Sequence, residues 1–211
     1  MNSSIVRDTR AGDLFHYRWA ATRVLNLIAP DSELKSVSIE GASKPCHGDY
    51  IIDVEECFSV KKIVYQLKYS TKHPNKECPL SFLGGTLEGF GTLYKELKAG
   101  KLSTEYVFLT NRPVSSAVKN LFSQAPTNKG ALKAINKYLR LSDNSAKQFC
   151  RRFKIIDSVE SSAQQLRNVE CRLMAMTSSP LINDEARALV DFVAEHAASQ
   201  NHVLTKARIL S

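Results

Sequence analysis

Two neighbouring stretches of alternating residues carry the side chains best suited to chemistry. Tyr50–Phe58 and Ile63–Tyr69 have the period-two pattern of β-strands, and Ser59–Lys62 between them predicts a hairpin turn. One face of this hairpin is expected to be apolar and to pack on the core. The other face is expected to gather acids, an amide and a lysine, namely Asp49, Asp53, Glu55, Gln66 and Lys68.

A four-residue turn would place Asp53 opposite Lys68 and Glu55 opposite Gln66. Carboxylate and amide oxygens are the ligands that a hard cation such as Mg²⁺ prefers, and such a metal activates water and neutralises charge on a phosphate. A lysine beside the metal can orient the water or stabilise developing negative charge. The group therefore suits phosphodiester hydrolysis. A solvated hairpin face with an ordinary Lys–Asp pair is the alternative, because short D…QxK patterns are common by chance.

The order of the motifs resembles a known family. Asp49 followed by Gln66-Leu67-Lys68 resembles the PD-(D/E)xK nuclease superfamily, in the Mrr-like variant that has Gln before the Lys. Residues 10–21 (RAGDLFHYRWAA), then Ile39-Glu40-Gly41, resemble the start of a bacterial anti-phage nuclease domain. The resemblance is strongest over residues 10–70 and extends to the FLTNRP run that ends at residue 113.

This resemblance implies a restriction-endonuclease-like α/β fold and metal-dependent cleavage of double-stranded DNA with little sequence preference, in anti-phage defence. It implies Mg²⁺, or alternatively Mn²⁺, as the cofactor. In related CBASS effectors the nuclease domain precedes a SAVED domain that senses a cyclic oligonucleotide, and other relatives pair with HerA-type ATPases. We therefore expect a linked sensor or an ATPase partner, and activation by homo-oligomerisation.

The resemblance also assigns residues. Asp49, Gln66 and Lys68 are the predicted catalytic set, and the predicted metal ligands are Asp49, Gln66, Asp53 and Glu40. Family spacing favours Asp49 as the main metal ligand, with 16 residues between it and Gln66. The idealised hairpin register favours Asp53 instead. A β-bulge at the start of the strand would reconcile the two. Gln66 stands where the family has an acid, so one ligand charge is lost.

Further candidates lie outside the hairpin. From the first helix, His16, Tyr17 and Arg18 could approach the site or DNA, although packing is the preferred interpretation for Tyr17. Residues 129–154 hold eight basic residues and one acid. The helical spacing of this segment predicts one basic face that follows DNA phosphates, with a solvated face as the alternative. The predicted DNA contacts are Arg18, Lys133, Lys137 and Arg140.

Composition agrees with an anionic partner. The net charge is +8 with a pI near 9.3, which favours nucleic acid first and a membrane surface second. No apolar run reaches the roughly 20 residues that span a bilayer, and no signal core opens the chain, so we expect a cytoplasmic protein without membrane contact. The five scattered cysteines show no CxxC pair and predict neither zinc nor disulfides. A non-catalytic DNA-binding or assembly module and an RNA-directed nuclease remain alternative functions.

Periodicity predicts the elements that position the site. We expect a helix at 10–28, strands at 37–40, 50–58, 63–69 and 106–110, and a helix at 82–98. Helices at 115–124, 129–140, 143–152, 159–177 and 182–198 should follow, with a short strand at 153–156. The expected architecture is a small mixed sheet flanked by helices, with a helical second half. We expect a nuclease domain over 1–200 (core 10–115, helical part 116–200) and the start of a linker at 201–211.

Overall fold

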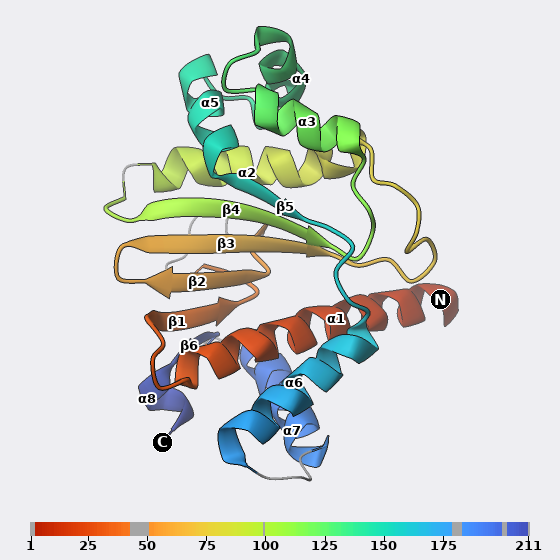
Figure 1. The fold of residues 1–211 in the computed structure, drawn as a ribbon, viewed down its shortest axis with the longest axis vertical. Helices are drawn as coiled ribbons and strands as arrows, with labels where there is room; N and C mark the ends of the chain where they lie inside the picture. The colour runs from red at the N-terminus through yellow and green to blue at the C-terminus, as the bar shows by residue number, and fades with distance from the viewer. Residues whose placement is uncertain (1–2, 43–50, 99, 179–182, 200–201, 211) are drawn as a thin grey trace.

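A six-stranded mixed sheet forms the centre of the protein (Figure 1). The computed structural model describes residues 3–42, 51–98, 100–178, 183–199 and 202–210. The sheet has the order β5-β4-β3-β2-β1-β6. The pairs β6–β1, β1–β2 and β2–β3 are antiparallel, and the pairs β3–β4 and β4–β5 are parallel. The strands are β1 (Leu34–Ile39), β2 (Val54–Phe58), β3 (Lys61–Lys68), β4 (Ser103–Thr110), β5 (Phe153–Ile156) and β6 (Val203–Thr205).

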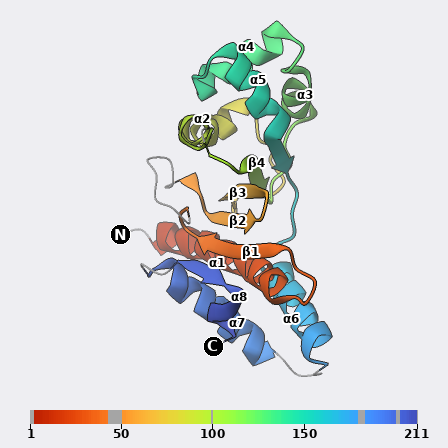
Figure 2. The same cartoon turned by 90° about the vertical axis from the view of Figure 1, so that its left-hand side faces the viewer.

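Helices cover both faces of the sheet in layers (Figure 2). On one face lie α1, α6 and α7, and on the other lies α2 with α3, α4 and α5 stacked outside it. The helices are α1 (Ser3–Ile28), α2 (Gly84–Leu97), α3 (Ser116–Gln124), α4 (Lys129–Leu139), α5 (Asp143–Arg152), α6 (Ser162–Thr177), α7 (Asn183–Ala197) and the short α8 (Lys206–Ile209), with a 3₁₀ turn η2 (Leu80–Leu83) before α2. None of the described helices is long and apolar enough to cross a membrane.

The chain alternates its side chains between two cores. On the inner strand β4, Tyr106 and Phe108 face the core under α2, whereas Val107 and Leu109 face the core under α1. The two parallel pairings need crossover connections, which α2 supplies before β4 and α3 to α5 supply before β5. The predicted mixed α/β sheet with a helical second half is confirmed.

Local capping explains why the helices of the second half were predictable. Ser115, Asn128, Ser142 and Ser161 each precede a helix, and each side-chain oxygen accepts a hydrogen bond from a backbone N–H of the first turn. The capped helices begin at, or within three residues of, their predicted starts. The edge strand β6, which pairs with β1, was not predicted.

The hairpin turn is shorter than predicted. Cys57 pairs with Lys62 and Glu55 with Val64, so only two residues, Ser59 and Val60, connect the strands. The predicted pairing of Glu55 with Gln66 is wrong by two residues. Because strand side chains alternate with a period of two, this shift leaves the paired residues of the two strands on their predicted faces.

The closest approach between α2 and α4 predicts a large effect at one glycine. A Cβ at Gly91 would lie 2.2 Å from the backbone oxygen of Leu139, so Gly91→Ala must push the two helices apart. We expect it to lower the free energy of unfolding by about 1–3 kcal/mol. In the same helix nothing lies within 4 Å of a Cβ at Gly85, and Gly85→Ala should raise stability by about 0.5–1 kcal/mol through helix propensity. Urea denaturation of both variants measures the contrast, and equal effects would contradict it.

Candidate functional site

Four predicted site residues meet at one edge of the sheet. Glu40 directly follows β1, Asp53 directly precedes β2, and Gln66 and Lys68 lie at the end of β3. Because β2 runs antiparallel to both β1 and β3, its beginning lies beside the ends of its two neighbours. The fifth predicted residue, Asp49, lies outside the described residues.

Asp53 is bonded to the residues on both sides of Gln66. Its backbone N–H donates to the carbonyl of Tyr65 at 2.9 Å, and its carboxylate Oδ2 accepts the N–H of Leu67 at 2.5 Å. The predicted position of Asp53 opposite Lys68 is therefore wrong, because the two-residue turn moves it opposite Gln66. The observed register therefore brings the Asp53 carboxylate closer to the Gln66 amide than the predicted register would have done.

Burial and nearby charges act on Asp53 in opposite directions. Burial raises the pKa of the Asp53 carboxyl above its ordinary value of 3.8, and the charge of Glu40 adds to this effect. The charges of His16 and Lys68, together with the N–H of Leu67, partly counteract the rise. The carboxylate is thus a costly buried charge that a bound cation would relieve.

Glu40 is held in place by hydrogen bonds to Asp53 and Tyr17. Its backbone is left-handed, with φ of 53°, and its N–H donates to the carbonyl of Asp53 at 2.7 Å. Its Oε1 accepts the hydroxyl of Tyr17 from α1 at 3.0 Å. Tyr17 therefore approaches the site as well as packing, so the preference for packing alone is corrected. No sequence pattern could have paired two residues 23 positions apart.

Gln66 is buried and its Oε1 has no hydrogen-bond partner among the described residues. An unsatisfied buried acceptor costs about 1–3 kcal/mol, so such an atom calls for a ligand. Two residues further along β3, Lys68 is exposed at the strand end and forms no ion pair with a described acid. The strand thus presents a buried acceptor and an exposed lysine, two residues apart, on one face.

The donor set fits a hard cation. Within the described part of the chain, no three His, Cys, Asp or Glu side chains form a group that could hold a metal ion. Two carboxylates and an amide oxygen are present instead, on Glu40, Asp53 and Gln66. Mg²⁺ suits such a set, because it is commonly held by one or two protein carboxylates and keeps several waters. A thiol- or imidazole-based zinc site does not fit these residues.

The other acids of the hairpin are used within the fold. Glu55 is fully buried and pairs with the Nζ of Lys62 at 3.2 Å. Glu56 lies on the opposite, mainly apolar face, where its Oε2 accepts the hydroxyl of Tyr65 at 2.6 Å and its Oε1 lies 3.8 Å from Arg23 Nε. Both carboxylates are thus engaged within the fold, and among the described hairpin acids Asp53 is the one that faces the site.

The predicted DNA contacts do not gather at this edge. Arg18 donates from Nη1 to the carbonyl and the Oγ of Ser162 at 3.1 and 3.0 Å, so it joins α1 to α6. Lys133, Lys137 and Arg140 belong to α4 and its C-terminal end, which α2 separates from the sheet (Figure 1). The exposed surface of α4 is therefore separate from the sheet edge that carries Asp53 and Lys68.

This chain is similar to a solved receptor structure at low sequence identity. No family model matches the chain, and no curated protein matches it. The structure of the Acinetobacter baumannii Cap4 SAVED/CARF-domain containing receptor with the cyclic trinucleotide 2'3'3'-cAAA is similar at a TM-score of 0.49 and 11% identity. That similarity covers 92% of this chain and 41% of the length of the receptor.

The raised pKa of Asp53 predicts a stability that depends on pH. The folded state holds the Asp53 proton more tightly than the unfolded chain, so the free energy of unfolding falls as pH rises from 3.8 through the raised pKa. In Asp53→Asn this loss is absent, while Asn can still accept the N–H of Leu67. We expect the variant to be the more stable protein at pH 7, with an advantage that shrinks toward pH 3.8.

Denaturant titrations from pH 4 to 8 without divalent metal test this expectation. Asp191→Asn, which alters an exposed carboxylate on α7, is the matched control and should leave the pH profile unchanged. A parallel pH profile for wild type and Asp53→Asn would show that the Asp53 charge carries no cost.

Proposed function

We propose that this protein is a metal-dependent nuclease that hydrolyses phosphodiester bonds in double-stranded DNA. The proposal rests on the buried Oε1 of Gln66, which has no hydrogen-bond partner among the described residues. Asp53 is bonded to Tyr65 and Leu67, the residues on either side of Gln66 on β3. Glu40 and Lys68 lie at the same sheet edge. Acids, an amide oxygen and a lysine are together the groups that metal-assisted phosphodiester hydrolysis requires.

Each side chain has a distinct proposed role. Asp53, Glu40 and Gln66 would hold Mg²⁺ or Mn²⁺, and Asp49 remains a proposed ligand on sequence spacing. When bound, the metal supplies a Lewis acid and an acidified water. Lys68 places a positive charge where negative charge develops on the phosphate. Because Gln66 contributes no charge, we expect weaker metal binding than an all-acid set would give.

The nature of the substrate and the control of the reaction rest on broader arguments. The net charge of +8 favours a polyanion, and the sequence resemblance to anti-phage nuclease domains points to duplex DNA. One such site cuts one strand, so a double-strand break needs two sites on one duplex. We therefore propose that oligomerisation activates cleavage, through a linked sensor domain or an ATPase partner.

Lys68→Ala tests the chemistry. Loss of the ammonium removes charge stabilisation in the transition state, so we expect plasmid degradation with Mg²⁺ to slow by about 100-fold or more. Lys35→Ala, which changes an exposed lysine on β1, should cut like wild type. Equal cutting by wild type and Lys68→Ala would refute the assignment.

The same assay separates the alternative functions. Faster cleavage of RNA than of duplex DNA would indicate an RNA-directed nuclease. Salt-dependent DNA binding without cleavage, even with Mn²⁺ at high protein concentration, would indicate a non-catalytic binding module.

Tyr17→Phe tests whether Glu40 belongs to the metal site. The variant removes only the hydroxyl that holds the Glu40 carboxylate, so we expect weaker Mn²⁺ binding in calorimetry and partial recovery of cleavage at high Mg²⁺. The control is Tyr69→Phe, which also removes a tyrosine hydroxyl. The Tyr69 ring stacks on Phe15, with ring centroids 4.5 Å apart. Unchanged Mn²⁺ affinity in Tyr17→Phe would exclude Tyr17 from positioning a metal ligand.

A further inference from the structure

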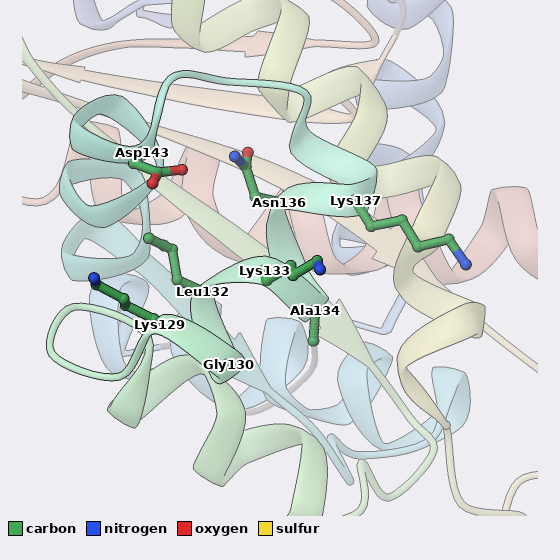
Figure 3. A pocket seen from close by; sticks show the side chains of 8 residues that line it. All are labelled: Lys129, Gly130, Leu132, Lys133, Ala134, Asn136, Lys137 and Asp143. Atoms are coloured by element: carbon green, nitrogen blue, oxygen red, sulfur yellow. The ribbon is translucent and has the colours of Figure 1, made fainter.

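The outer face of α4 is a basic surface that the site does not use. Over this face lies a hollow of about 820 Å³, to which α5 contributes Asp143 (Figure 3). The apolar side of α4 is buried against the helices around it, so the polar side is left to solvent. The residues that line the hollow are Lys129, Gly130, Leu132, Lys133, Ala134, Asn136, Lys137 and Asp143.

Three lysines on this face lack an acidic partner. Lys129, Lys133 and Lys137 are exposed and take part in none of the ion pairs that the described residues form. Asp143 lines the same hollow without pairing with any of them. No ion pair with a described acid therefore neutralises their charges.

Three other cations near this face do have acidic partners. Lys119 pairs with Asp157 at 2.8 Å, Lys154 with Glu105 at 2.6 Å, and Arg140 with Glu88 at 2.8 Å. Arg140 was predicted to contact DNA, but the structure pairs it with Glu88, and Lys129 takes its place in the unpaired set.

The geometry of the three lysines suits a row of phosphates. Lys129, Lys133 and Lys137 follow one another by four residues, and each step advances about 6 Å along a helix. Gly130 and Ala134 lie between them, so no bulky side chain keeps a ligand away from the helix (Figure 3). A duplex presents one phosphate per 3.4 Å or so on each strand, a spacing that flexible lysines can follow.

The same surface fits other polyanions less well. None of the residues lining the hollow is aromatic, whereas binding of single strands depends on aromatic stacking platforms. A membrane-binding helix needs an exposed apolar face, but the apolar residues of α4 are buried, namely Ala131, Leu132, Ile135 and Leu139. A continuous double-stranded phosphate backbone remains the best match.

We infer that Lys129, Lys133 and Lys137 form a docking surface for the phosphate backbone of duplex DNA, separate from the sheet edge that carries Asp53 and Lys68. The inference takes its ligand from the proposed function. Because lysine contacts with phosphate carry no base information, this surface holds DNA without regard to sequence. It raises affinity for the substrate and leaves the chemical step to the sheet edge.

Binding measurements without divalent metal test the surface apart from cleavage. The full chain is titrated with two unrelated 30-base-pair duplexes over a range of NaCl concentrations. The variant carries Lys129→Gln, Lys133→Gln and Lys137→Gln together, and helix propensity is nearly unchanged because Gln and Lys rank alike. We expect it to bind both duplexes at least about tenfold more weakly, with a log Kd against log salt slope smaller by about 2–3.

The matched control removes the same charge elsewhere. It carries Lys35→Gln, Lys95→Gln and Lys101→Gln, three exposed lysines outside α4, and should bind nearly as wild type does. Equal weakening in both triple variants would reduce the effect to net charge and overturn the inference, as would unchanged binding in the α4 variant. Tighter binding of a single strand than of the duplex by wild type would also overturn it. A wild type that binds through α4 but never cuts would leave this surface standing and refute the nuclease proposal.

Discussion

The register of the β2–β3 hairpin is the constraint on which the candidate site depends. The two-residue turn sets Asp53 opposite Gln66, and the bonds of Asp53 to Tyr65 and Leu67 hold it there. A slip by one residue would turn Gln66 into the apolar core under α1. The polar edge exists because this register and the antiparallel β1–β2 pairing bring three strand ends together.

The site is held with its polar groups incompletely satisfied. Burial penalises the charge of Asp53, and Gln66 Oε1 has no described partner. Elsewhere in the same hairpin the buried acids are neutralised, Glu55 by Lys62 and Glu56 by Tyr65 and Arg23. At the sheet edge, by contrast, a penalised charge and an unsatisfied amide oxygen lie together among the described residues, and a local cost of this kind is typical of functional sites.

The two polar surfaces of the protein are built on different elements and have different chemistry. The sheet edge combines acids with one lysine, which suits a cation and a single phosphate. The α4 face presents Lys129, Lys133 and Lys137 without a paired acid, which suits many phosphates at low specificity. With α2 between α4 and the sheet, residues of one surface can be changed without touching the other.

The sequence by itself determined most of the elements and which face of each strand its residues occupy, because period-two alternation, helix periodicity and capping residues are local properties. The strand Phe153–Ile156 and the helices before it follow from such patterns alone. Local patterns also placed Gln66 and Lys68 on the face opposite the apolar core.

Only the tertiary structure decided which side chains meet. The hairpin register depends on packing at the turn, so Asp53 came to lie opposite Gln66 instead of Lys68. The contact of Tyr17 with Glu40, the bond of Arg18 to Ser162 and the pairing of Arg140 with Glu88 join residues from separate elements. Such contacts form when the helices pack on the sheet and on one another. No periodic pattern in a single sequence predicts which residues will then meet.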